Sequence, residues 1–314
     1  MAVAGDRRAL VGPGGYSVIV VPDAFAAGIV SMAGDAGRAW LGGLPALIDA
    51  LCQQWQLEVD GAPMHGYLGL VVPVLRGDER CVLKVSWLDE STAAEIAALT
   101  IWNGHGAVRL LAADPAIGAL LLERLDSQRS LHEVEIGQAI GIAGQLLRLL
   151  AVPVPNDLPH LTNVAAGLAE TLPDRWERLN RPLSRAFVDA ARDAAIQIGP
   201  SAGSLLVNYD LHYGNVLAGE REPWLAIDPK VVVGDPEYGL AQLLWTRLEE
   251  IEQAAGLSYH FSALVDQAGL DLPRARSWTL VRCVDYWLWA LSVGLTEDPV
   301  RCEAITTWLR HPNH

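Results

Sequence analysis

Residues 208–236 read NYDLHYGNVLAGEREPWLAIDPKVVVGDP, and this stretch holds three oxygen-bearing side chains at a spacing with chemical meaning. Asn215 follows Asp210 by five residues, and Asp228 follows Asn215 by thirteen. Phosphoryl transfer from Mg-ATP needs a carboxylate that takes or orients the proton of the acceptor hydroxyl. It also needs an amide oxygen and a second carboxylate to hold Mg²⁺. The three side chains meet these needs in type and order.

Two residues upstream match the groups that position nucleotide phosphates. Lys84 stands in the β-rich run VLKV, and Glu95 follows eleven residues later in a predicted helix. A strand lysine paired with a helix glutamate holds the α- and β-phosphates of ATP in kinases. Of 23 Lys and Arg residues, only Lys84 and Lys230 are lysines. Because Arg does not replace a compact ammonium, a lysine in such a background indicates chemistry.

Each of these features also has an ordinary structural explanation. A strand lysine is more often a solvated edge residue, and Glu95 alone reads as a surface carboxylate on a helix. Asp228 precedes Pro229, so it could simply be a turn residue. The functional interpretation therefore depends on the order and spacing of the whole set.

The first 125 residues are predicted to form mostly a sheet with one or two helices. A helix is expected over 40–57, and the β-rich runs 66–75 and 80–87 form a hairpin. Ser91 and Thr92 open a second helix that ends near Asn103, since Ser and Thr favour helix starts. A second hairpin joins two further strands: 107–114 and 118–125.

From residue 129 onward the pattern becomes helical. Helical periodicity occurs in five segments: 131–151, 161–171, 184–198, 238–255 and 274–293. The sequence therefore predicts an α+β plan with two lobes. The lobes are residues 1–122, with sheet and helices, and residues 130–314, mostly helical, joined by a hinge at 123–129.

Composition and charge exclude several classes of protein. The chain has 314 residues, 51% hydrophobic and 19% charged, which is typical of a globular protein. No apolar run reaches the roughly 18–20 residues that span a bilayer, so a membrane protein is not expected. The net charge of −14 argues against a nucleic-acid partner, which requires a basic face. The charge permits a cationic substrate, although a solubilising surface explains it equally well.

The cysteines and the N-terminus indicate a cytoplasmic protein. No zinc site or disulfide framework is expected from the four cysteines, which lie far apart: Cys52, Cys81, Cys283 and Cys302. Arg7 and Arg8 precede an apolar stretch and faintly resemble a twin-arginine signal. Asp23 inside that stretch argues against such a signal.

Several segments together resemble one known family. They are LVVPVL (70–75), VLKVSW (82–87), AVRLLAADP (107–115), LLLERLD (120–126), DLHYGNVL (210–217) and REPWLAIDPKVVVGDP (221–236). In combination they resemble the aminoglycoside phosphotransferases, which share the protein-kinase-like fold. The most similar branch is that of streptomycin 6-phosphotransferases and hydroxyurea phosphotransferases. SWTLVR (277–282) and LWALSVGLT (288–296) match more loosely.

The resemblance implies a bilobal protein-kinase-like fold and a role for each matching residue. Asp210 is implied as the catalytic base. Asn215 and Asp228 are implied as ligands of Mg²⁺. Lys84, with Glu95, is implied to position the phosphates of ATP, with GTP as a second possible donor.

The nucleotide is also expected to contact backbone in the first lobe. Glu123 and Leu125 lie in the segment 122–125, which resembles the hinge whose backbone bonds adenine. Residues 66–70 resemble the loop over the phosphates, and the chain has no Walker-type GxxxxGK[ST] motif. His212 is expected to stabilise the catalytic loop.

The chain departs from the family pattern in ways that concern the acceptor. Asn208 stands where the family usually has His, and Gly239 where it usually has Asp. The predicted acceptor contacts are Tyr238, Asp285, Trp287 and Trp289. Because a polycation needs carboxylate partners and this helix offers only Asp285, we expect an acceptor of modest charge bound by aromatic stacking. A place in the core is nevertheless the favoured explanation of the tryptophans.

The sequence therefore predicts an ATP- and Mg²⁺-dependent O-phosphotransferase. It is expected to modify a hydroxyl of a small-molecule antibiotic, aminoglycoside- or streptomycin-like, and to confer resistance without a nucleic acid, membrane or protein partner. One alternative is the same chemistry on a nucleoside or peptide antibiotic, hydroxyurea or a sugar. Another is a nucleotide-binding pseudo-enzyme, which the complete set of candidate residues disfavours.

Overall fold

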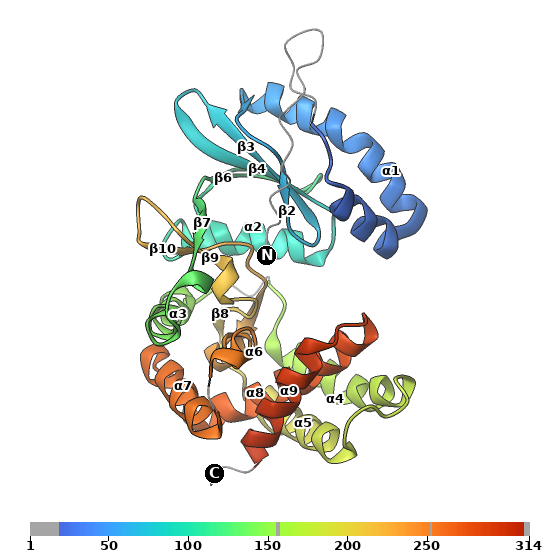
Figure 1. Cartoon of the computed structure of the whole chain (residues 1–314), viewed down its shortest axis with the longest axis vertical. Coiled ribbons are helices and arrows are strands. Elements are labelled where there is room, and N and C mark those ends of the chain that lie inside the picture. Colours follow the sequence, from blue (N-terminus) through green and yellow to red (C-terminus); the bar gives the residue numbers. More distant parts are fainter. Residues whose placement is uncertain (1–18, 155–157, 252, 311–314) are drawn as a thin grey trace. The chain divides into compact units, whose positions relative to one another are not determined.

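The computed structural model describes residues 19–154, 158–251 and 253–310, which form two compact units (Figure 1). Unit 1 consists of residues 19–104 and 108–125, and unit 2 of residues 105–107 and the described residues from 126 onward. The boundary at 125/126 lies within the predicted hinge. Arg7 and Arg8, the suggested twin-arginine pair, lie outside the described residues.

An antiparallel sheet is the frame of unit 1. β3 (Gly69–Arg76), β4 (Glu79–Ser86), β6 (Ala119–Glu123) and β5 (Leu110–Asp114) lie side by side in that order, and the short β1 (Glu58–Val59) and β2 (Met64–His65) pair with β3. Gly77 makes the turn between β3 and β4 at φ 60, a left-handed conformation that favours glycine. Both predicted hairpins are present.

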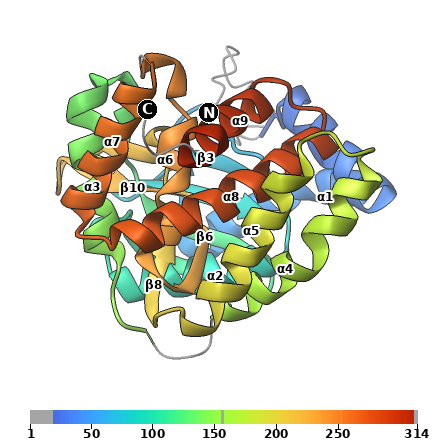
Figure 2. The ribbon, with the colours of Figure 1, turned by 90° about the horizontal axis from the view of Figure 1, so that it is seen from below.

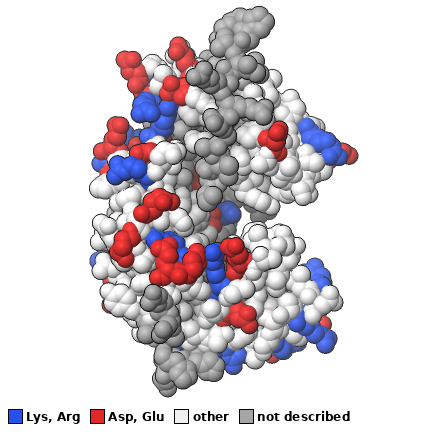
Figure 3. Space-filling model, viewed as in Figure 1, with Lys and Arg blue, Asp and Glu red and all other residues white. Residues whose placement is uncertain are grey.

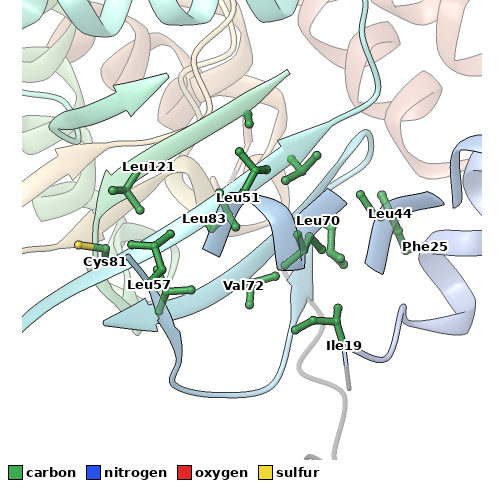
Figure 4. Close-up of a cluster of buried hydrophobic side chains, with 14 of the residues drawn as sticks. Ile19, Phe25, Leu44, Leu51, Leu57, Leu70, Val72, Cys81, Leu83 and Leu121 are labelled. Carbon is green, nitrogen blue, oxygen red and sulfur yellow. The ribbon is translucent and has the colours of Figure 1, made fainter. Parts of the chain in front are cut away.

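The helix α1 (Asp23–Trp55) packs against this sheet and closes the core of unit 1. Leu44 and Leu51 of α1 are buried in one cluster with Leu70, Val72 and Leu83 of the sheet (Figure 4). The predicted helix at 40–57 is therefore only the second part of a longer one. The earlier part is interrupted at Gly34 (φ 57, ψ −128), which breaks the helical periodicity that the sequence prediction relied on.

The helix α2 (Glu90–Trp102) is the one predicted to begin at Ser91 and Thr92 and to end near Asn103. Asp89 caps its start by accepting the backbone N–H groups of Ser91 and Thr92 at 2.9 and 3.2 Å. Asn103 ends the helix in the left-handed conformation, with φ 45.

Unit 2 contains two small sheets among helices. β8 (Leu205–Asn208) pairs with β11 (Val231–Gly234), and β9 (Val216–Ala218) lies between β7 (Asp126–Ser130) and β10 (Trp224–Ala226). The long helices are α3 (Ile136–Leu150), α4 (Leu161–Arg178), α5 (Arg185–Ile198), α7 (Gln253–Ala268), α8 (Leu272–Ser292) and α9 (Glu297–Arg310). α8 contacts both α5 and α9, and Figure 2 shows it between them.

The prediction of one helix over 238–255 is wrong. This segment holds the short turns η4 (Pro236–Gly239) and η5 (Leu248–Glu250), the short helix α6 (Ala241–Trp245) and only the start of α7. Arg247 leaves helical geometry at φ −140 and donates to the backbone oxygen of Val134 at 2.8 Å and to Glu250 at 2.6 Å. The helix therefore does not continue through Arg247, whose buried side chain instead bonds to carbonyl groups of another segment.

Residues 105–107 belong to unit 2, although the sequence predicts them in the N-terminal lobe. Ala226 donates its backbone N–H to Gly106 at 2.9 Å, and Arg221 donates to the carbonyl oxygen of Ala107 at 3.2 Å. These bonds tie the segment to β10 and the turn before it. Among the described residues, no helix combines the length and the apolarity that crossing a membrane requires.

Candidate active site

Lys84 and Glu95 form a buried ion pair within unit 1. The Nζ atom of Lys84 lies 2.7 and 2.8 Å from the two carboxylate oxygens of Glu95, and the side chains are 10% and 7% exposed. Lys84 is on β4 and Glu95 on α2, as the sequence predicts. A Cβ on Gly69 would stand 3.3 Å from Cε of Lys84, so the lysine stem packs on this glycine.

Glu123 and Leu125 mark the end of the sheet in unit 1. Glu123 ends β6, and its side chain accepts the backbone N–H of Arg109 at 2.8 Å. Its own N–H donates to the carbonyl oxygen of Arg109 at 3.0 Å. Leu125 is half-buried at the last residue of the unit. The adenine contacts expected of this segment stay a prediction.

The loop from β8 to β9 in unit 2 brings Asp210 and Asn215 together. The side-chain amide of Asn215 donates to the backbone oxygen of Asp210 at 3.2 Å, which orients the amide. His212 accepts the N–H of Gly214 at 3.1 Å and so stabilises the loop, and burial lowers its pKa, which favours the neutral ring.

A backbone hydrogen bond ties the residue before Asp228 to Asn215. The N–H of Ile227 donates to the carbonyl oxygen of Asn215 at 2.9 Å. Asp228 has φ 49, which is uncommon for a residue other than glycine, and it precedes Pro229, which disfavours helical conformations. Strained backbone of this kind is concentrated at functional sites.

The carboxylate of Asp210 has two neighbours that sequence reasoning did not assign to it. Nε2 of Gln242 donates to Oδ1 at 3.0 Å, and Nζ of Lys230 lies 3.8 Å from Oδ2. The sequence marks Lys230 as one of two lysines, two residues after Asp228, but does not place it beside Asp210. Gln242 had no signal, since the segment that carries it was predicted as an ordinary helix.

Arg282 of α8 supports the loop from the buried side. Its guanidinium carbon lies 5.2 and 4.9 Å from the ring centroids of Tyr209 and Tyr238, and it donates to the backbone oxygen of Tyr209 at 3.2 Å. Cation–π contacts of this kind hold a guanidinium on aromatic faces. The residue before Asp210 is therefore anchored to α8.

The two departures from the family pattern touch each other. Asn208 accepts the N–H of Asp210 through Oδ1 at 3.1 Å. A Cβ on Gly239 would stand 2.7 Å from the backbone oxygen of Asn208, closer than real Cβ contacts come. This backbone therefore has no room for an aspartate at position 239.

The four predicted acceptor residues lie in different surroundings. Tyr238 is 3% exposed and packs between Tyr209 and Trp278, and burial raises its pKa to about 12. Trp287 is 5% exposed and packs on a phenylalanine of α5. Asp285 accepts from Arg175 at 2.6 Å and lies 3.7 Å from Arg282. Trp289 is 41% exposed.

Trp289 is the outer member of an aromatic stack. Its ring centroid lies 5.2 Å from that of Tyr286, and Tyr286 stacks on Trp245 at 4.6 Å with an interplanar angle of 10°. Burial and the hydrogen bond to Asp298 raise the pKa of Tyr286, so its hydroxyl stays neutral. The stack offers a preformed aromatic surface on α8.

Substitutions in the buried ion pair test whether the site needs a compact ammonium or only a positive charge. Lys84→Arg keeps the charge but replaces a compact ammonium with a wide planar group in a tight space. We expect a loss of kcat/KM for ATP of about 10-fold or more, and a smaller loss for Glu95→Ala, because Glu95 is expected to orient Lys84 rather than to contact the phosphates. Steady-state kinetics with varied ATP measure both. Wild-type values in both variants would contradict the assignment.

Comparisons with known proteins agree with the resemblance found in the sequence. The family described as aminoglycoside/hydroxyurea antibiotic resistance kinase matches residues 54–294. A streptomycin 6-kinase of Streptomyces glaucescens is 40% identical over 284 residues, which are 88% of this chain and 92% of the relative. A hydroxyurea phosphotransferase of Kitasatospora aureofaciens is 40% identical over 294 residues, 92% of this chain and 85% of the relative.

Solved structures support the fold. A thermostable mutant of the aminoglycoside phosphotransferase APH(4)-Ia, in complex with AMP-PNP and hygromycin B, has a TM-score of 0.58 at 16% identity and covers 84% of this chain and 98% of its own. Spectinomycin phosphotransferase APH(9)-Ia has a TM-score of 0.51 at 14% identity, with 86% and 94% covered. The predicted fold class is confirmed. The chain belongs to the aminoglycoside/hydroxyurea antibiotic resistance kinase family.

Proposed function

We propose that this protein is an ATP-dependent O-phosphotransferase that modifies a hydroxyl group of a small-molecule antibiotic and so confers resistance. The observation that carries the proposal is in unit 2: the Asn215 amide donates to the backbone oxygen of Asp210, and the backbone N–H of Ile227, the residue before Asp228, donates to the carbonyl oxygen of Asn215. The buried Lys84–Glu95 pair supplies the phosphate-binding group of the same chemistry. We also propose the cytoplasm as its place of action, in accord with four free cysteines.

Asp210 is proposed as the group that orients the acceptor hydroxyl and takes its proton. Its Oδ1 atom is held by Gln242 at 3.0 Å, so the carboxylate cannot rotate freely. Catalysis of phosphoryl transfer is mostly positioning and electrostatic stabilisation. Because Oδ1 is held in this way, Oδ2 keeps a fixed direction toward the acceptor hydroxyl.

Asn215 and Asp228 are proposed as ligands of Mg²⁺. Amide and carboxylate oxygens suit this ion, and the bond from the Asn215 amide to Asp210 fixes which side of the amide presents oxygen. No cluster of three or more His, Cys, Asp or Glu residues suited to a metal occurs in the described part of the chain. Mg²⁺ in such sites is held by one or two carboxylates together with substrate phosphates and water, which would complete the coordination here. When bound, Mg²⁺ neutralises charge on the phosphates.

The relatives named above supply candidate acceptors with which the substrate can be identified. Streptomycin and hydroxyurea are incubated with the protein, ATP and Mg²⁺, and mass spectrometry looks for the gain of one phosphoryl group. Hygromycin B and spectinomycin, named for the similar structures, extend the panel. Phosphorylation of one of them is the expected result. An unchanged panel beside ATP binding would leave two alternatives: transfer to a nucleoside antibiotic, a peptide antibiotic or a sugar, and a nucleotide-binding pseudo-enzyme.

Charges in unit 2 bear on the class of acceptor. Acidic side chains lie beside basic ones on the face shown in Figure 3. Arg301 contacts Asp298 at 2.9 Å and Glu249 at 3.1 Å, and Asp285 is held by Arg175. These three carboxylates are therefore already paired with arginine. We propose an acceptor of modest positive charge that stacks on Trp289.

Trp289→Ala is expected to raise the acceptor KM about 5- to 20-fold while kcat changes little, because a stacked ring contributes roughly 0.5–1.5 kcal/mol beyond its buried area. The matched control is Tyr259→Ala, which removes another exposed aromatic ring of unit 2. Wild-type KM should also change less than about twofold between about 0.1 M and 1 M salt. A steep rise with salt would indicate a polycation held by carboxylates.

A further inference from the structure

Lys230 lies beside the proposed catalytic carboxylate because of the pairing of β8 with β11. Val231 is the register partner of Asn208, and the N–H of Tyr209 donates to the carbonyl oxygen of Lys230 at 2.9 Å. This register sets Lys230 beside the residue that precedes Asp210. Its Nζ atom lies 3.8 Å from Oδ2 of Asp210.

The two oxygens of Asp210 have different surroundings. Oδ1 accepts from Gln242, a residue only 9% exposed, whereas Oδ2 faces Lys230, whose side chain is 48% exposed. Oδ2 is therefore the oxygen left to bond an acceptor hydroxyl. The ammonium of Lys230 lies on this same solvent-reaching side of the carboxylate.

A structural role explains Lys230 poorly. A nitrogen–oxygen distance of 3.8 Å is too long for a hydrogen bond, and half-exposed ion pairs contribute little to stability. Arg282, the buried cation behind the loop, already anchors it through Tyr209. The ammonium of Lys230 keeps three N–H donors on a flexible stem that can serve another anion.

We propose that Lys230 is a catalytic residue that contacts the transferring phosphoryl group, an inference that rests on the proposed function. The acceptor oxygen forms a bond to phosphorus, the bond between phosphorus and the bridging oxygen of ATP breaks, and ADP leaves with that electron pair. The hydroxyl proton passes to Oδ2 of Asp210.

The distance between Lys230 and Asp210 places the ammonium within reach of a phosphoryl group bound beside Oδ2. A hydroxyl bonded to Oδ2 lies about 2.7 Å from it, and the phosphorus is attached to that hydroxyl oxygen. An ammonium 3.8 Å from Oδ2 then reaches the phosphoryl oxygens with a small movement of its stem. Negative charge is spread over these oxygens in the transition state, so a cation that contacts them there lowers the barrier.

The test compares Lys230→Met with wild type and with Arg192→Met. Arg192 is a matched control, because it also lies 3.8 Å from a carboxylate, that of Asp193, with a side chain 44% exposed. Transfer from ATP is measured to streptomycin, to hydroxyurea and to water. Isothermal titration measures the affinity for ADP with aluminium fluoride, which mimics the transferring phosphoryl group, and for ADP alone.

Lys230→Met is expected to lower the transfer rate about 10²–10³-fold, as loss of one preoriented donor does. Its affinity for ADP with aluminium fluoride should fall by a similar factor, while its affinity for ADP alone stays within about threefold. Lys230→Arg, which keeps the charge, should recover part of both losses. Arg192→Met should behave as wild type in every assay.

Two results would overturn the proposal while leaving the proposed function intact. One is near-normal transfer by Lys230→Met in an active wild-type background. The other is slower transfer with unchanged affinity for ADP with aluminium fluoride, because a residue that only positions Asp210 would give that pattern. A wild type that transfers phosphate neither to an acceptor nor to water would instead contradict the proposed function itself.

Discussion

Asp210→Asn is expected to lower kcat by about 10²–10⁴-fold, the contribution typical of general base catalysis. The substitution is mild in structure, because the Asn oxygen can still accept from Gln242, which bonds Oδ1 at 3.0 Å in the wild type. The backbone oxygen that receives the Asn215 amide is unchanged as well. The variant therefore removes the charge and the proton-accepting oxygen while it keeps the loop.

Nucleotide affinity distinguishes this loss from unfolding. ATP binding, measured by isothermal titration, should stay within about threefold of wild type, because Asp210 is proposed to act on the acceptor. Asp193→Asn is the control, since it removes a carboxylate that is 74% exposed on α5. Near-normal turnover in Asp210→Asn would remove Asp210 from the mechanism.

Asp228→Asn is expected to abolish Mg²⁺-dependent turnover, with a loss of about 10³-fold or more, since it removes a charged ligand of the ion. Asn is a better test here than Ala. Asp228 has φ 49, a left-handed conformation that Asn adopts more readily than most residues, so Asn spares the backbone. Asp228→Ala should lose at least as much activity and some stability.

The metal requirement separates a ligand from a turn residue. AMP-PNP binding is titrated at several Mg²⁺ concentrations by calorimetry, and Asp228→Asn should shift the half-saturating Mg²⁺ concentration upward by about tenfold or more. Asn215→Ala should shift it less, because a neutral amide is the weaker ligand. An unchanged Mg²⁺ dependence in both variants would contradict the assignment, whatever the activity.

Local patterns predicted those elements whose positions depend on neighbouring residues in the chain. The hairpin of β3 and β4 follows from two β-rich runs around Gly77, and α2 follows from the helix-start residues Ser91 and Thr92, whose N–H groups Asp89 caps in the structure. The prediction failed for α1, where an internal glycine interrupts the periodicity, although burial of Phe25 and Ile29 still favours the helix. It failed also at Arg247, whose bonds reach carbonyl groups more than a hundred residues away.

The amino-acid sequence alone predicts an Asp, Asn, Asp set in the order that phosphoryl transfer needs and a strand lysine with a helix glutamate, and these motifs indicate the family to which the chain belongs. Spacing and residue type suffice for that, because side-chain chemistry and short-range geometry are local. The surroundings of Asp210 follow instead from the folded structure. Gln242 is 32 residues away in the chain, and Lys230 reaches Asp210 through the register of β8 with β11. The folded structure also decided that Tyr238 and Trp287 are buried while Trp289 is exposed. Such contacts depend on how distant segments pack, and sequence periodicity carries no information about that packing.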